Sequence, residues 1–127
     1  MTFAPFKPWT WQVPQHFNIG VACSDKHLGT PAENNIAMIV EDDTLGTSQI
    51  TFAELAQRTS QFAQLLRDLA LGLGERVLIR LANCLHYPTA FLGTMKRGAV
   101  AVPTSTLLTS EEVAYLAKDS SAAVLVT

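Results

Sequence analysis

The sequence predicts an α/β fold: part of a doubly wound parallel sheet, preceded by a helix and a β-hairpin. Two observations predict it. From residue 76 onward, apolar runs and helical patterns alternate as strand, helix, strand, helix, strand. The three strands, residues 76–82, 99–103 and 122–126, are almost continuously apolar, as parallel strands buried on both faces are. Each helical crossover between such strands is expected to be right-handed.

The composition limits the classes of protein to consider. A chain of 127 residues allows one compact domain. Only 16% of the residues are charged, so we expect further polypeptide or a partner to cover much of the surface. The net charge of −2, without a run of lysine or arginine, excludes the basic face that nucleic acid needs. No secretory signal and no membrane span are recognisable, so we expect a soluble, cytoplasmic protein.

The first 16 residues differ from the rest in composition. Residues 1–15 hold three prolines and four aromatic residues. Proline at this density prevents a regular helix, so we predict an extended arm whose aromatic side chains, Trp9 and Trp11 among them, pack onto the body of the protein. Exposed tryptophan is also typical of interfaces, so a partner-binding segment is the alternative.

A short helix and a hairpin follow the arm. The spacing of apolar residues predicts a helix that begins at Asn18 and ends by Gly29. Residues 36–40 and 48–52 are predicted to form two antiparallel strands around a polar loop that contains a glycine.

The long helix after the hairpin has the clearest start in the chain. Thr51 and Glu54 form a capping box, in which each side chain bonds to the backbone of the other residue. Gly72 or Gly74 is expected to end the helix. The apolar residues that recur at helical spacing predict one buried face, made of Leu55, Phe62, Leu65, Leu66 and Leu69.

Two further helices connect the parallel strands. The first is predicted over residues 85–97, with Asn83 as its N-cap and Gly98 at its end. The second opens at another capping box, formed by Thr109 and Glu112.

No catalytic constellation is visible in these residues. The three histidines lie in different predicted elements, and none stands at metal-ligand spacing from another ligand. No Gly-x-Ser-x-Gly elbow of a hydrolase occurs. Gly72-Leu73-Gly74 precedes a strand and lacks the third glycine of a dinucleotide loop. Cys23 and Cys84 match no metal or redox spacing, and we expect both to be small buried residues.

The carboxyl ends of the parallel strands are the place where a ligand is expected. In open α/β sheets, ligands bind in the crevice outside these ends. Here the ends are Ala82-Asn83, Thr104-Ser105-Thr106 and Thr127. The hydroxyl-rich loop 104–106 could contact a ligand, or it could be only a turn before the next helix.

The order of several short motifs resembles the adenylate-forming superfamily, and in particular its acyl-CoA synthetases. Residues 50–55 resemble the first core motif of that superfamily, an apolar-Thr-aromatic-x-Glu-Leu stretch. Residues 95–103 resemble the second, in which a helix ends in Lys-x-Gly-Ala and a strand runs into proline. Gly74-Glu75-Arg76-Val77 and the loop 104–112 are similar to the stretches that stand at the same places in the family.

The resemblance covers residues 17–127 and implies the N-terminal portion of an AMP-binding domain, truncated before its catalytic motifs. The arm and the residues after it resemble the medium-chain or aryl acyl-CoA ligases. An enzyme of this family activates a carboxylic acid as acyl-AMP with ATP and Mg, and then transfers the acyl group to CoA. The phosphate loop, metal-binding segment and catalytic lysine come later in the family's order, so we expect this chain alone to bind no cofactor and to be inactive.

One set of site residues follows from the resemblance. In CoA-forming members, the loop after the second parallel strand lies near the CoA nucleotide, sometimes with an arginine offered to phosphate. The corresponding residues here are Ser105, Thr106 and Leu107, without an arginine. They are therefore expected to contact CoA through backbone or apolar groups rather than through phosphate.

The chain ends at Thr127, after an apolar strand that no predicted helix covers. We expect a truncated ligase whose partners are the remainder of the ligase chain and a small carboxylic acid. A stand-alone interaction or regulatory module that keeps half of the ligase fold is the alternative. Open sheet edges invite pairing, so we also expect self-association through the strand that begins at Arg76 or the one that begins at Ala122.

Overall fold

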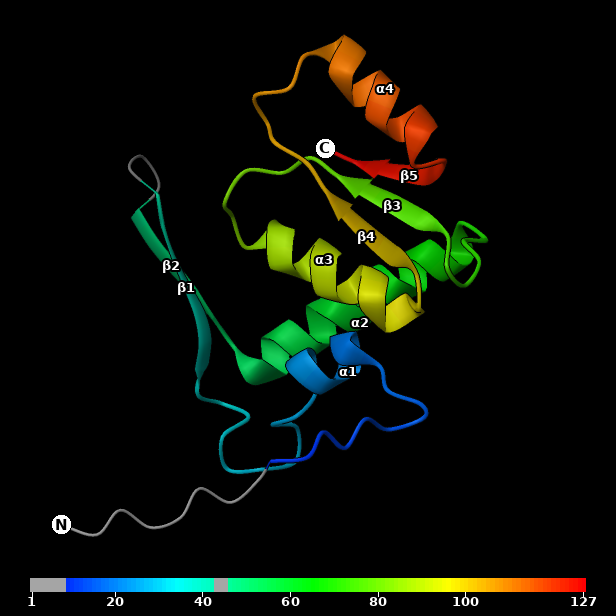
Figure 1. The fold of residues 1–127 in the computed structure, drawn as a ribbon. Helices are drawn as coiled ribbons and strands as arrows, with labels where there is room; N and C mark the ends of the chain where they lie inside the picture. Colours follow the sequence, from blue (N-terminus) through cyan, green and yellow to red (C-terminus); the bar gives the residue numbers. More distant parts are fainter. Residues whose placement is uncertain (1–8, 43–45) are drawn as a thin grey trace, which may run out of the picture.

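The computed structural model describes residues 9–42 and 46–127 of the chain. The expectations for the first eight residues and for the tip of the hairpin lie outside these ranges. The described helices and strands follow the predicted order (Figure 1): α1 Ile19–Ser24, β1 Ile36–Asp42, β2 Gly46–Thr51, α2 Phe52–Asp68, β3 Arg76–Ile79, α3 His86–Arg97, β4 Val100–Pro103, α4 Ser110–Asp119 and β5 Ala122–Val126.

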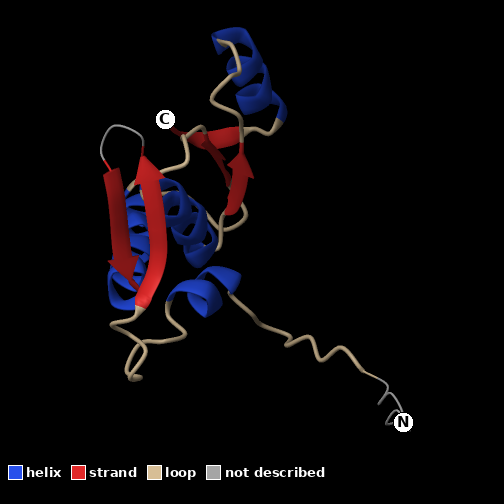
Figure 2. Cartoon of the chain, turned by 90° about the vertical axis from the view of Figure 1, so that its left-hand side faces the viewer, coloured by secondary structure: helices blue, strands red, loops and turns tan. Residues whose placement is uncertain are grey.

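The three parallel strands form one sheet in the order β4-β3-β5. Val77 in the middle strand pairs with Ala101 on one side and with Val124 on the other. The expectation of an open edge at Arg76 is therefore wrong, because the strand that begins there has a neighbour on both sides. The edges of this sheet are β4 and β5. The hairpin of β1 and β2 forms a separate antiparallel pair, which lies beside α2 and α3 (Figure 2).

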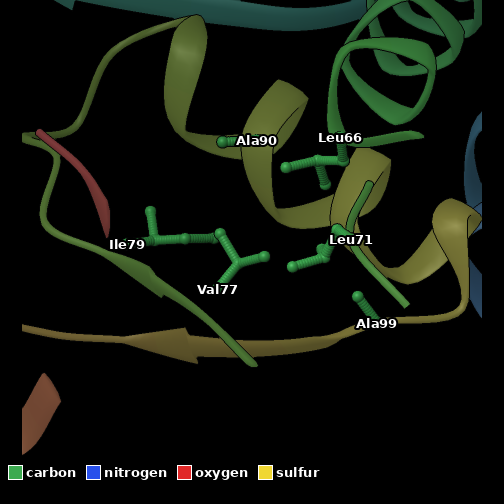
Figure 3. Packing of buried hydrophobic residues seen from close by; sticks show 6 residues of the cluster. All are labelled: Leu66, Leu71, Val77, Ile79, Ala90 and Ala99. Carbon is green, nitrogen blue, oxygen red and sulfur yellow. The ribbon is translucent and has the colours of Figure 1, made fainter. Parts of the chain in front are cut away.

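The hydrophobic core lies between the sheet and helices α2 and α3. Strand side chains alternate between the two faces, and Val77 and Ile79 point from β3 toward the helices (Figure 3). Leu66, at the end of α2, and Leu71, in the connection that follows, close the core from the other side. Partly buried side chains of β4 and β5 extend the same face, namely Ala101, Val124 and Val126.

The opposite face of the sheet is only partly covered. Leu78 is fully buried there, but Val100 and Leu125, on the two edge strands, keep 47% and 48% of their surface exposed. Helix α4 contacts β5 and lies away from α2 and α3 (Figure 1). The described residues therefore cover one face of the sheet well and the other incompletely.

Helix α1 packs closely on α3. Gly20 has no side chain, and a Cβ placed on it would lie 2.4 Å from the backbone nitrogen of Lys96. The ammonium of Lys96 forms an ion pair with a carboxylate oxygen of Asp25 at 2.6 Å. It also donates a hydrogen bond to the hydroxyl of Ser60 on α2 at 2.9 Å. Asn18 caps α1 as predicted and also donates to the carbonyl of Lys96. The helix is shorter than predicted, since it ends at Ser24.

Of the other three predicted helix starts, two are confirmed. Thr51 and Glu54, and likewise Thr109 and Glu112, form complete capping boxes. Asn83 does not cap α3, because that helix begins only at His86 and no side chain bonds to its first turn.

The end of α2 and its buried face differ from the prediction. The helix ends at Asp68, before either glycine, because Ala70 takes the left-handed conformation with φ of 59°. The nitrogen of Leu71 then donates to the carbonyl of Leu66, as in a Schellman motif, and both side chains enter the core. Leu65 and Leu69 were predicted to be buried, but they are 51% and 58% exposed. Leu55 and Leu66 are buried as predicted, and Phe62 is partly buried against the core. Thr59 is buried on the same helix although it was not predicted to be.

The described part of the arm does not pack onto the body. Trp9 and Trp11 are 68% and 77% exposed, and their rings lie against each other with centroids 4.1 Å apart. The predicted packing is therefore wrong for these two residues, while the domain division at residue 17 stays a prediction. Cys23 is exposed rather than buried, and Cys84 is half-buried. No helix in the described ranges is long and apolar enough to cross a membrane.

Candidate functional site

A cavity of about 350 Å³ lies at the carboxyl ends of β3 and β4. Residues of both strand-end loops and one residue of α3 line it: Leu81, Ala82, Asn83, Tyr87, Thr104, Ser105 and Thr106. This is the position at which open α/β sheets bind their ligands.

The parallel pairing of β3 and β4 brings the two loops together. Ile79 pairs with Pro103 at the end of the ladder. Beyond this pair, the backbone nitrogen of Thr104 donates to the carbonyl of Ile79 at 2.8 Å, and the Thr104 hydroxyl donates to the same oxygen at 3.3 Å. Because Pro103 has no N–H to donate, the backbone hydrogen bonding between β4 and β3 continues beyond it through Thr104.

The structure brings most of the predicted strand-end residues together. Ser105 and Thr106 line the cavity, and so does Asn83 from the neighbouring strand end. Leu107 lies outside the cavity lining and is 91% exposed. Thr127 lies at a different depression, between β5 and α4. The contact of the loop with CoA stays a prediction.

Tyr87 is a cavity residue that sequence reasoning missed. It stands in the first turn of α3, and its ring is nearly parallel to that of Phe91, with centroids 6.1 Å apart. The sequence does contain a signal for it. Tyr87 and Phe91 are four positions apart, so they share one face of the helix that follows the strand end, and this spacing indicates an aromatic ring near the crevice.

Arg80 is the second missed residue. Its guanidinium Nη2 donates to the carbonyl of Thr106 at 2.7 Å and to the carbonyl of Leu108 at 3.0 Å. The charge is therefore directed at the backbone of the loop, and Arg80 is absent from the lining of this cavity.

The chemistry of the cavity is that of a neutral hydrogen-bonding site. Its polar side chains are three hydroxyl groups, one amide and one phenol, which both donate and accept hydrogen bonds. The lining contains no charged side chain, so it offers no partner to phosphate comparable to an arginine fork. Within residues 9–42 and 46–127, no group of three His, Cys, Asp or Glu side chains could hold a metal ion.

Comparison with known proteins identifies the family. Residues 26–127 match the family described as AMP-binding enzyme. The chain belongs to this family. The match covers the sheet, its helices and the hairpin, so it includes every residue of the cavity.

An acetyl-coenzyme A synthetase of Methylobacillus flagellatus is a relative of this chain. It is 36% identical over 97 residues, which make up 76% of this chain and 14% of that protein. The chain therefore spans only a small part of the length of the curated relatives that it matches.

Two solved ligase structures have the same fold. The anthranilate CoA ligase AuaEII, in complex with anthranoyl-AMP, superposes with a TM-score of 0.76 at 28% identity, over 89% of this chain and 20% of that one. A benzoate CoA ligase from Burkholderia xenovorans superposes with a TM-score of 0.71 at 29% identity, over 87% of this chain and 21% of that one. These superpositions confirm the predicted α/β fold as that of a ligase N-terminal region.

Proposed function

We propose that this chain is the scaffold portion of a cytoplasmic, ATP-dependent acyl-CoA ligase, which forms acyl-AMP from a carboxylic acid and transfers the acyl group to CoA. The match of residues 26–127 to the AMP-binding enzyme family carries the proposal. The location of the cavity at the carboxyl ends of the strands is consistent with it.

Within this function, the chain has a structural role. ATP and Mg are bound by residues in the remainder of the ligase chain, which also stabilise the charge that develops on the α-phosphate. The 127-residue chain alone is inactive. Its contribution is the sheet and the helices that position the strand-end cavity.

The loop of Ser105, Thr106 and Leu107 forms one wall of the CoA site. Because the cavity is lined by neutral hydrogen-bonding groups, it receives an uncharged portion of CoA, such as an amide of the pantetheine arm or the adenine base. Leu107 is largely exposed and adds an apolar contact at the rim of the loop.

The carboxylic acid is a fatty or an aromatic acid. Anthranilate and benzoate are the acids named for the two solved ligases, and acetate is the acid implied by the name of the Methylobacillus relative. These acids define the panel with which the ligase activity should be measured.

The test uses the polypeptide encoded by the whole reading frame that contains this sequence, beside the 127-residue chain. We expect the former to form AMP and acyl-CoA from ATP, CoA and at least one acid of the panel, and the latter to form neither. A reading frame that stops after Thr127, with a protein that captures a defined partner, would overturn the proposal in favour of an interaction module.

The isolated chain also associates with itself through the open edge of β5. Within residues 9–42 and 46–127, the strand pairs with β3 on one side only, and it contains no proline or charge that would discourage pairing on the other. The edge of β4, by contrast, ends in Pro103, so it offers one N–H fewer.

A further inference from the structure

Arg80 connects three parts of the chain that are distant in sequence. Its backbone nitrogen donates to the carbonyl of Val126, the last residue of β5, at 2.8 Å. Its side chain reaches over to the loop after β4 and bonds to the carbonyls of Thr106 and Leu108. A single residue, directly after β3, thus bonds to both β5 and the cavity loop.

The other hydrogen bonds of this loop do not replace the arginine. Thr104 attaches only the first residue of the loop to β3. The nitrogens of Leu107 and Leu108 donate to Ser105, to its hydroxyl and its carbonyl respectively, which shapes the turn but does not tie it to the sheet. Among the hydrogen bonds of the described residues, those that attach residues 106–108 to the end of β3 therefore come from Arg80.

Stability alone does not favour an arginine at this position. The Nε atom of Arg80 is buried and has no hydrogen-bond partner among the described residues, and a buried donor without a partner is unfavourable. The side chain also borders the depression between β5 and α4, where Val113 and Leu125 are its apolar neighbours. An apolar residue would continue the strand pattern here without that cost.

We propose that Arg80 is the positioning residue of the cavity loop: it fixes the carbonyls of Thr106 and Leu108, and so holds Ser105 and Thr106 in the wall that faces CoA. The inference rests on the proposed function of the cavity. Hydrogen bonds from a charged donor are stronger than neutral ones, and two of them from one nitrogen restrict the loop at two points. Arg80 itself need not touch CoA.

Arg76, the first residue of β3, provides a matched control. It stands at the opposite end of β3, and its guanidinium donates to the carbonyls of Ser120 and Ser121 at 2.5 and 2.8 Å. The chemistry is the same, but the segment it holds is the turn between α4 and β5. Arg76→Met therefore removes an equivalent pair of bonds and leaves the cavity loop attached.

The first measurement is hydrogen–deuterium exchange over residues 104–109 in the polypeptide of the whole reading frame. We expect Arg80→Met to speed exchange there by about tenfold or more, which corresponds to about 1.4 kcal/mol, and Arg80→Lys to speed it less. Arg76→Met should speed exchange at residues 120–122 instead. Unchanged exchange of the loop in Arg80→Met would overturn the proposal.

The second measurement is steady-state kinetics of the same variants. Arg80→Met should raise the KM for CoA about tenfold. The KM for ATP and the rate of carboxylate-dependent ATP–pyrophosphate exchange should stay within about twofold of the unsubstituted protein, because only the thiol-transfer step uses CoA. Arg80→Lys should restore part of the KM. Equal effects of Arg76→Met and Arg80→Met on the KM for CoA would overturn the positioning role. If the unsubstituted protein uses no CoA, the proposed function is refuted. Hydrogen–deuterium exchange of residues 104–109 would then still decide whether Arg80 holds the loop.

Discussion

Gly20 shows how a single residue determines the packing of a helix. A Cβ at this position would lie 2.4 Å from the nitrogen of Lys96 and 2.6 Å from the carbonyl oxygen of Leu92. Both are backbone atoms of α3, so they cannot move aside as the tip of a side chain can. The absence of a side chain is what allows α1 to approach α3 so closely.

Gly20→Ala should therefore destabilise the protein, although alanine is the better helix former by about 1 kcal/mol. We expect a net loss of about 1–3 kcal/mol in the free energy of unfolding, because overpacking forces the two helices apart. Urea denaturation followed by circular dichroism measures it. Cys23→Ala, an exposed substitution in the same helix, should change the stability by less than about 0.5 kcal/mol. Equal stability of Gly20→Ala and the parent would contradict the close approach.

The ion pair of Lys96 and Asp25 is a second residue-scale feature with a measurable effect. The Lys96 side chain is only 9% exposed, and that of Asp25 is 27% exposed. Asp25→Asn leaves the ammonium with a carbonyl and hydroxyl groups as partners. We expect a loss of about 2 kcal/mol, below the usual 3–5 for a fully buried pair because the carboxylate is partly hydrated.

A double-mutant cycle with Lys96→Met isolates this pair. The double variant should be more stable than the sum of the two single losses implies, because it removes both charges. Asp68→Asn is the matched control, since Asp68 is exposed and bonds only to Gln64 in the described structure. Additive losses in the cycle would show that the pair contributes nothing beyond its separate groups.

At the scale of elements, the two capping boxes make stability depend on pH. The hydrogen bond from the backbone of Thr51 lowers the pKa of Glu54 below its usual 4.5, and that from Thr109 lowers the pKa of Glu112 in the same way. A carboxyl group whose pKa is lower in the folded state stabilises the fold above its unfolded pKa. That stabilisation is lost as the pH falls through the folded pKa.

The double variant Glu54→Gln/Glu112→Gln should therefore melt below the parent at pH 7, and the difference should shrink as the pH falls below about 4.5. Thermal melts between pH 7 and pH 3 measure it. Glu111→Gln, in the same first turn of α4 but outside the capping box, is the matched control and should lower the melting temperature at pH 7 less than the double variant does. A difference between parent and double variant that stays constant down to pH 3 would contradict the role of the charge.

Elements specified by neighbouring residues could be predicted from the sequence. A capping box needs residues three apart, and the parallel strands are recognisable by their apolar composition, so both were found. The bounds of the strands are close except for the first, which was predicted over residues 76–82 and ends at Ile79. The strand-end cavity was predicted in part for the same reason, since Ser105, Thr106 and Asn83 each follow a recognisable strand.

Features that depend on tertiary packing could not be predicted in this way. Ala70 and Ser121 take left-handed conformations, with φ of 59° and 51°, where glycine is the usual residue. At the end of α2, the burial of Leu71 in the core favours that turn over the expected stop at a glycine. Arg80 reaches the loop across 26 residues of sequence, and no local pattern indicates such a contact.

At the scale of the whole molecule, the two faces of the parallel sheet are unequal. One face packs on α2 and α3 through a continuous core. On the other face, α4 and β5 leave an apolar depression whose lining includes Val113, Ala117 and Leu125. An exposed apolar depression beside an unpaired strand edge favours association with a further strand. For the isolated chain, a second copy offers such a strand.

Leu125→Lys should therefore reduce self-association of the isolated chain. A charged side chain on an edge strand discourages pairing with another chain, and here it also replaces an apolar side chain of the depression, which Arg80 already borders. Sedimentation velocity at several protein concentrations measures the change, and we expect the parent to sediment faster as concentration rises and the variant to do so much less. Tyr115→Lys makes a matched substitution at an exposed position of α4 outside that depression, and it should leave the concentration dependence intact. A parent chain that stays monomeric at high concentration, or a Tyr115→Lys variant that behaves like Leu125→Lys, would show that the β5 edge is not the site of association.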